Sequence, residues 1–140
     1  MILLDTTCLV YAVGGDHERR EPCLTLMSAI AEQRVIARTT TQVIAEFAHV
    51  RGRRRDRSDA SSLAEDYTAL LGPLETISEP DLTEALRIWQ ATPRIGTFDA
   101  LLVAVATRLE VEALVTEDRA LRDVDVLPVM TAAEAVSTYC

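Results

Sequence analysis

Four acidic residues are the strongest candidates for chemistry in this sequence: Asp5, Glu46, Asp99 and Asp118. Several carboxylates cannot stay ionised side by side without a compensating cation, and a hard divalent ion is the simplest one. Ligation by oxygen alone, with no nearby cluster of histidine or cysteine, favours Mg²⁺, or Mn²⁺ in its place, over zinc. Such an ion lowers the pKa of bound water, orients an in-line attack on phosphorus and stabilises the leaving oxygen. The quartet therefore predicts a metal centre suited to phosphodiester hydrolysis.

Two members of the quartet, Asp5 and Asp118, follow predicted strands. Asp5 comes directly after the apolar run 2–4, and Asp118 comes just after a predicted strand at 113–116. In a parallel sheet, ligands bind at the carboxyl ends of the strands, so both carboxylates are expected there. Thr116, at the same strand end, could hold a carboxylate or a water. A simple helix-capping role remains open for either aspartate.

Glu46 interrupts an apolar stripe. Val43, Phe47 and Val50 have the spacing of an inward helix face, and Glu46 occupies the missing place on that face. The pattern predicts a glutamate aimed at the core, where a carboxylate is costly unless it is paired or bound to a metal. A pairing arginine such as Arg38, or a place at the wet edge of the stripe, would explain it as well.

Asp99 repeats this arrangement in a helix that is otherwise almost free of charge. Together with Leu102, Val103 and Ala106 it forms one helical stripe. An acid in the first turn of a helix is favourable by itself, but such acids usually face water. The stripe therefore predicts that Asp99 faces inward.

The elements that must position these residues alternate between strand and helix. Strands are predicted at 2–4, 35–37, 74–77, 113–116 and 124–129. Helices are predicted at 6–13, 22–33, from the 39–41 cap to the arginine stretch, at 58–71, from 78 to before Pro93, at 98–109, near 118–121 and after Thr131. The alternation predicts an α/β fold, a three-layer α/β/α sandwich with a mostly parallel central sheet, in a single domain over 1–140.

Composition predicts a protein of the cytoplasm. Hydrophobic residues make up 49% of the 140 residues, enough for a core without disulfide or metal staples. The three cysteines are widely spaced and suggest neither a disulfide framework nor a zinc site. No apolar stretch approaches a membrane span, and the first residues lack the pattern of a secretion signal.

The basic residues are unevenly distributed. The net charge is −8, and all 14 basic residues are arginine. Five of them against one aspartate make the stretch 51–57 locally +4. Because the guanidinium fork matches phosphate oxygens, an RNA-binding role is predicted for four of these residues: Arg51, Arg53, Arg54 and Arg55. A solvated helix end without a partner is the alternative.

Four short motifs, in this order, resemble those of PIN domains: Leu3-Leu-Asp-Thr-Thr-Cys-Leu-Val10, Gln42-Val-Ile-Ala-Glu-Phe47, Thr97-Phe-Asp-Ala-Leu-Leu102 and Val115-Thr-Glu-Asp-Arg119. The compact length resembles the VapC toxins of toxin–antitoxin pairs. The resemblance implies a Mg²⁺-dependent endoribonuclease that cleaves structured RNA such as tRNA or rRNA, a homodimer, and a cognate antitoxin that occludes the site. It assigns metal binding to Asp5, Glu46, Asp99 and Asp118, with Thr6 and Thr116 as supporting groups. Glu117 competes for the metal role.

Other functions are less well matched. A haloacid-dehalogenase-like phosphatase needs a second aspartate where Thr7 stands, a response-regulator receiver needs a strand-end lysine, and a P-loop is absent. A catalytically inactive PIN-like module that docks on RNA or on a protein remains the rival from another class. Two apolar helix faces, one with Leu24, Met27 and Ile30 and one with Leu63, Tyr67 and Leu70, could each receive a partner helix or pack in the core.

Overall fold

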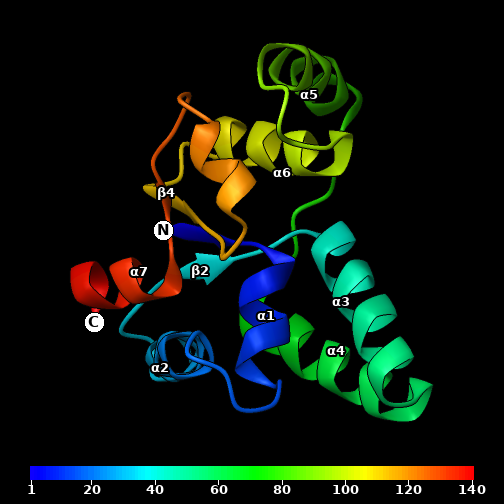
Figure 1. The fold of residues 1–140 in the computed structure, drawn as a ribbon, viewed down its shortest axis with the longest axis vertical. Coiled ribbons are helices and arrows are strands. Elements are labelled where there is room, and N and C mark those ends of the chain that lie inside the picture. The colour runs from blue at the N-terminus through cyan, green and yellow to red at the C-terminus, as the bar shows by residue number, and fades with distance from the viewer.

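A computed structural model, which describes all residues from 1 to 140, shows a parallel sheet between two layers of helices (Figure 1). The strands are β1 (Ile2–Leu4), β2 (Ala37–Arg38), β3 (Ala113–Val115) and β4 (Val129–Met130). The helices are α1 (Thr6–Ala12), α2 (Arg20–Ala31), α3 (Thr41–Arg54), α4 (Arg57–Leu71), α5 (Glu79–Ala91), α6 (Thr97–Arg108), the 3₁₀ turn η1 (Arg119–Asp123) and α7 (Ala132–Tyr139). The predicted α/β/α sandwich is confirmed.

The sheet has the order β2-β1-β3-β4, and every neighbouring pair is parallel. Helices α1, α2 and α7 lie on one side of it and α5 and α6 on the other, while α3 and α4 form a hairpin beside α1 (Figure 1). Leu4 pairs with Val115 in the register of β1 and β3. The chain therefore leaves both central strands at the same level, and the residues that follow them meet at one edge.

One hydrophobic cluster of 34 buried residues holds the layers together. The two central strands are fully buried, as their continuous apolar sequences predict for a sheet covered on both faces. Helix α6 is buried along Leu102–Ala106 because it lies between the sheet and α5, which confirms the expectation of a helix packed on both sides. No helix in the structure is both long enough and apolar enough to cross a membrane.

The two apolar faces suggested as partner sites belong mainly to this core. Met27, Ile30 and Tyr67 are buried, and the three leucines of the two faces are partly buried against the same cluster. The exposed large apolar side chains lie elsewhere: Leu82, Leu86 and Trp89 on the outer face of α5, and Ile36, Phe98 and Val126 at separate positions. Helix α5 contacts α6 through its other face, which leaves Leu82, Leu86 and Trp89 in solvent.

Four predicted boundaries were wrong. Helix α2 begins at Arg20, two residues before Pro22, because the first-turn N–H groups of a helix need no acceptor and proline is tolerated there. The predicted strand 74–77 is only one bridge, between Thr40 and Glu75, since the neighbouring edge strand β2 has two residues. The predicted strand 124–129 shrinks to β4, and the other edge strand, at 35–37, is shifted to Ala37–Arg38.

Candidate active site

The four predicted acids line one cleft at the carboxyl ends of β1 and β3. The cleft has a volume of about 270 Å³, and its walls include Asp5, Glu46, Asp99 and Asp118. They come from four separate segments: the end of β1, the middle of α3, the first turn of α6 and the start of η1. The fold therefore brings together side chains that are up to 113 positions apart in the chain.

Asp5 is the buried member of the group, with 6% of its surface exposed. Its Oδ1 accepts a hydrogen bond from the Thr6 N–H at 2.7 Å, so it caps α1 as well. Its Oδ2 accepts two more, from the Thr7 hydroxyl at 2.7 Å and the Thr116 hydroxyl at 2.6 Å. The capping role and the site role are thus not alternatives, because one carboxylate serves both.

Two threonines tie Asp5 to the segment that follows β3. Thr116 donates to Asp5 and accepts the Asp118 N–H at 3.0 Å, so its hydroxyl links the Asp5 carboxylate to the Asp118 backbone. Thr7 donates to Asp5 and accepts the Glu117 N–H at 2.9 Å. Thr7 was not predicted to support the site, although its place two positions after Asp5, at the start of a helix, was the available signal.

The expectation that Glu46 points into the core was wrong. Val43 and Phe47 are buried, but Glu46 is exposed and lies at the wet edge of the stripe. Its Oε2 accepts a 2.6 Å hydrogen bond from the Thr6 hydroxyl, which holds the carboxylate against the end of β1. The suggested partner Arg38 binds Glu75 instead, at 2.7 Å. Glu46 thus reaches the cleft from its solvent side, with Thr6 as its support.

Asp99 is half-buried and shows most directly that the four acids share one electrostatic environment. Burial raises the pKa of its carboxyl, and the negative charges of Asp5, Asp118 and Glu46 raise it further. The Gly96 N–H, which donates to Asp99 Oδ2 at 3.3 Å, opposes this shift. Burial and the three neighbouring acids thus favour the neutral carboxyl of Asp99, and a bound cation would favour its ionised form.

The donor set fits a divalent metal ion. None of the four carboxylates forms an ion pair with an arginine, although the molecule holds ten ion pairs elsewhere. The ionisable lining of the cleft is otherwise Tyr11 and Arg54, so the potential ligands are oxygens and no histidine or cysteine is among them. Such a set matches hard cations with oxygen ligands.

Glu117 faces away from this cleft. Its Oε1 accepts the Ala132 N–H at 2.8 Å, at the start of α7, and its Oε2 lies 3.6 Å from Arg19 Nε. Its carboxylate is therefore committed to joining β3 to α7 and α2. Cys8 and Cys23 lie beside it, with ligand atoms within 4.8 Å of one another.

This buried trio is not equivalent to the acidic cleft. A hydrogen bond with Cys23, and then burial, raise the pKa of the Cys8 thiol, so it stays protonated. The Cys8 thiol donates to the Val115 carbonyl at 3.4 Å. A neutral thiol with its own acceptor does not call for a metal ion, since the thiolate is the form that binds one.

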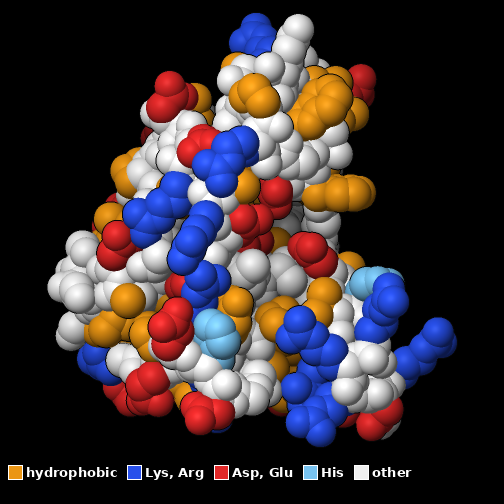
Figure 2. Space-filling model, viewed as in Figure 1, with side chains coloured by type: hydrophobic (Ala, Val, Ile, Leu, Met, Phe, Trp, Pro, Cys, Tyr) orange, Lys and Arg blue, Asp and Glu red, His pale blue; other side chains and the backbone are white.

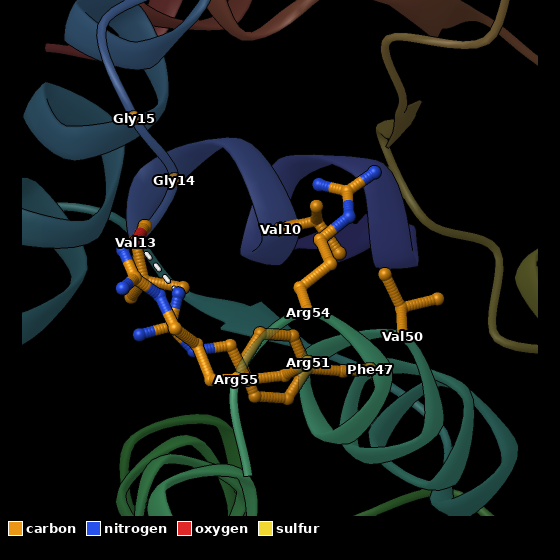
Figure 3. Close-up of a pocket in the computed structure, with 9 residues that line it drawn as sticks. All are labelled: Val10, Val13, Gly14, Gly15, Phe47, Val50, Arg51, Arg54 and Arg55. Atoms are coloured by element: carbon orange, nitrogen blue, oxygen red, sulfur yellow. Dashed lines mark hydrogen bonds between the residues drawn. The ribbon is translucent and has the colours of Figure 1, made fainter.

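The arginine stretch divides into a structural residue and an exposed group. Arg51 forms three hydrogen bonds to two partners: two to the Asp59 carboxylate, with Nε 2.5 Å from Oδ2, and one to the Val13 carbonyl at 3.2 Å. Figure 3 shows the bond to Val13. Arg51 fastens α3 to α4 and α1, so its donors are used within the fold. Arg53, Arg54 and Arg55 are exposed. Arg54 extends along α1 and lines the acidic cleft. It also lines a second pocket, formed by α1, the segment after it and the end of α3, which Figure 3 shows.

Comparison with known proteins places this arrangement in a family. The family model of the PIN domain matches residues 2–127. Ribonuclease VapC7 of Mycobacterium tuberculosis is 45% identical over 128 residues, which cover 88% of this chain and 86% of that protein.

Two solved structures share the fold. VapBC2 from Rickettsia felis, bound to a DNA fragment from its promoter, has a TM-score of 0.71 at 18% identity and covers 94% of this chain and 98% of that one. The sarcin-ricin-loop-cleaving toxin VapC20 of Mycobacterium tuberculosis has a TM-score of 0.66 at 15% identity, with coverage of 81% and 87%. Family model, sequence relative and fold agree, and the chain belongs to the PIN-domain family, in its VapC branch.

Proposed function

We propose that this protein is a metal-dependent endoribonuclease, the toxin of a toxin–antitoxin pair, and that it cleaves structured RNA such as tRNA or rRNA. The observation that carries the proposal is the cleft that Asp5, Glu46, Asp99 and Asp118 line together, none of them in an ion pair with an arginine. The similarity to ribonuclease VapC7 supports the reaction class, and the fold shared with VapC20 is consistent with it.

The roles of the residues follow from their contacts. Asp5, Asp99 and Asp118, with Glu46 from the solvent side, would hold Mg²⁺, or Mn²⁺ in its place. When bound, the ion supplies an activated water and charge stabilisation at the scissile phosphate. Thr7 and Thr116 hold the Asp5 carboxylate in one orientation, and Thr6 does the same for Glu46. These hydroxyls fix the ligands before the ion arrives.

RNA cleavage by the purified protein tests the proposal. With tRNA and rRNA as substrates and Mg²⁺ or Mn²⁺ present, we expect specific cuts that disappear with a chelator. Asp5→Asn and Asp99→Asn should each lower the rate by about 10³-fold or more, the scale of a lost preorganised charge in a catalytic site. Asp66→Asn is the matched control, because Asp66 is exposed on α4 and forms no ion pair. Sequencing the RNA ends would identify the cut site.

A catalytically inactive module that docks on RNA or protein is the competing function. It would bind RNA without cutting any of the tested substrates, and Asp5→Asn would leave that binding intact. Wild-type protein that is free of contaminating nuclease and inactive with both metals would favour this alternative.

We also propose that Arg53, Arg54 and Arg55 contact RNA phosphates at the α3 side of the cleft. Their exposure, and the position of Arg54 on the cleft wall, support this role. Replacing the three with alanine should weaken RNA binding and flatten its salt dependence, and an unchanged salt slope would refute the idea.

A cognate antitoxin that covers the acidic cleft follows from the family resemblance. The apolar outer face of α5 is a candidate surface for a homodimer, which Leu86→Glu should convert to monomer in sedimentation equilibrium.

Three cysteines without disulfides support a cytoplasmic location, and the single core supports one domain over residues 1–140.

A further inference from the structure

A second polar groove adjoins the acidic cleft on the side opposite α3. It has a volume of about 480 Å³, and none of its nine lining residues is hydrophobic. Four of them are arginines: Arg19, Arg94, Arg119 and Arg122. Asp118 lines both this groove and the acidic cleft. The two are therefore parts of one continuous surface.

The arginines come from three segments that the fold brings together. Arg119 and Arg122 belong to η1, Arg94 lies in the loop between α5 and α6, and Arg19 precedes α2. Figure 2 shows acidic side chains in the hollow at the centre of this face, with basic side chains gathered on both sides of it. The group over η1 lies on one side and the group at the α3–α4 junction on the other (Figures 1 and 2).

Arg19 forms the rigid wall of the groove. Its Nη1 donates to the Glu117 carbonyl at 3.1 Å and its Nε lies 3.6 Å from the Glu117 carboxylate. Its guanidinium also lies 5.5 Å from the centre of the Tyr11 ring, a cation–π arrangement. A guanidinium held in this way loses little further entropy when it binds an anion.

The other three arginines are available to an incoming anion. Arg119 is exposed and forms no ion pair or hydrogen bond through its side chain. Arg94 pairs with Asp123 at 3.2 Å and Arg122 with Glu134, but in both pairs the side chains are 40–63% exposed. Surface pairs of this kind contribute little free energy and exchange readily.

The charge of the groove is positive once Asp118 is assigned to the metal site. The four arginines then face Glu117 and Asp123 in the lining and Glu134, the partner of Arg122, a balance of +4 against −3. In a chain with a net charge of −8, such a local excess needs a reason, because the overall field of the protein repels polyanions.

We propose that this groove binds a backbone phosphate of the RNA substrate, next to the phosphate that lies over the acidic cleft. The inference rests on the proposed ribonuclease function, which places RNA at Asp118. Guanidinium forks bind phosphate oxygens bidentately, and contacts of this kind position a nucleic acid without reading its sequence. Together with Arg53, Arg54 and Arg55 on the α3 side, the groove gives the RNA a positive surface on both sides of the acids.

The lining favours phosphate over a peptide. A peptide partner uses pockets for apolar side chains or a free strand edge, and this groove has no hydrophobic lining residue. An acidic segment of a protein remains the rival ligand, and the experiment includes it.

Salt-dependent RNA binding tests the proposal. The probe is a fluorescein-labelled RNA hairpin, titrated at several salt concentrations in an Asp99→Asn background so that the RNA stays intact. Arg94→Ala and Arg119→Ala should each weaken binding on the order of tenfold and reduce the slope of log K against log salt by about 0.7 to 1. Arg119→Lys should retain most of the slope, since it keeps the charge. Arg87→Ala, on the exposed face of α5 and paired with Glu84, is the matched control and should change neither.

Three further measurements separate the outcomes. Oligoglutamate of similar net charge replaces the RNA in one arm, and a loss of affinity for that peptide alone would overturn the proposal. Thermal unfolding of each variant excludes loss of fold. Cleavage of the same hairpin, with Asp99 restored, tests the parent function. If the hairpin is cut but the salt slopes are unchanged, the groove proposal fails and the function stands. If nothing is cut but the slopes fall, the groove binds RNA and the proposed function fails.

Discussion

Two groups of carboxylates in this molecule have opposite surroundings. Asp81 and Glu75, near the contact between α5 and α6, face arginines: Asp81 Oδ1 lies 2.8 Å from Arg108 Nε, and Glu75 contacts Arg38 at 2.7 Å and Arg108 at 3.7 Å. The acids of the cleft face one another. Asp81 is less exposed to solvent than Asp99, yet its pKa is lowered, whereas the pKa of Asp99 is raised.

The difference shows that burial alone does not decide the charge state of these groups. Burial raises the pKa of both carboxyls. For Asp81 the hydrogen bonds from Arg108 and Ser78 outweigh it, whereas for Asp99 the neighbouring acids add to it. The paired group stabilises the fold by itself, and the unpaired group needs a cation from solution. The arginine-paired carboxylates thus stabilise the fold directly, whereas the acids of the cleft lack such partners.

The largest expected difference concerns added metal. Mg²⁺ should stabilise the wild-type protein, by about 2.7 kcal/mol at a concentration 100 times its Kd. Asp5→Asn should abolish most of this gain because it removes a ligand, whereas Asp81→Asn should retain it. Thermal unfolding with increasing Mg²⁺, and with chelator as the reference, measures the effect. Equal responses of the two variants would mean that the metal does not bind in the cleft.

A smaller effect is expected from Asp81→Asn on stability itself. The change should lower the free energy of unfolding by about 1–2 kcal/mol at neutral pH, below the range for fully buried pairs because the Arg108 side chain is 40% exposed. Because the folded pKa is lowered, the contribution is present above the ordinary carboxyl pKa of about 3.9 and is lost as the pH falls through the folded value. Urea unfolding at neutral and acidic pH measures it.

The control for this prediction is Arg87→Ala, which removes an exposed pair on the same helix, between side chains at 3.4 Å. It should cost no more than a few tenths of a kcal/mol at any pH. A comparable loss from both variants would show that the Asp81–Arg108 pair has no special role.

The comparison also explains which parts of the site were predictable from sequence. Asp5 and Asp118 follow apolar strands, and parallel strands place their carboxyl ends at one edge, so their meeting follows from local pattern and topology. The inward orientation of Asp99 could also be predicted, from its place on an apolar stripe of its helix. Glu46 was predicted to point into the core, but it is exposed. Helical periodicity indicates only which side of a helix a residue lies on, and the edge of the buried side is in contact with solvent.

Contacts between residues far apart in the chain could not be predicted from local sequence patterns. Arg51 looked like part of a free basic stretch, but it binds Asp59 and the Val13 carbonyl, a choice set by how α1, α3 and α4 pack. The groove arginines are separated by up to 103 positions, from Arg19 to Arg122, and only the tertiary structure brings them together. The predicted strand 74–77 failed for the same reason, since strand formation depends on the length of the neighbouring edge.

The smallest expected effect has the opposite sign to that of Asp81. In chelator, Asp99→Asn should stabilise the protein by a few tenths to about 1 kcal/mol at neutral pH, because it removes a carboxylate that three others repel. The amide oxygen of asparagine still accepts the Gly96 N–H, so the helix start is kept. The same urea unfolding series, run without metal, measures this gain.

The pH dependence of the two variants should therefore diverge. The folded pKa of Asp99 is raised, so between about 3.9 and that value the folded wild type binds more protons than the unfolded chain, and its stability falls as the pH rises. The repulsion is fully present above the raised pKa and is relieved below it, where wild type and Asp99→Asn should converge. If Asp99→Asn were less stable than wild type in chelator at neutral pH, the carboxylate would be serving the fold as Asp81 does, and the contrast between the two regions would not hold.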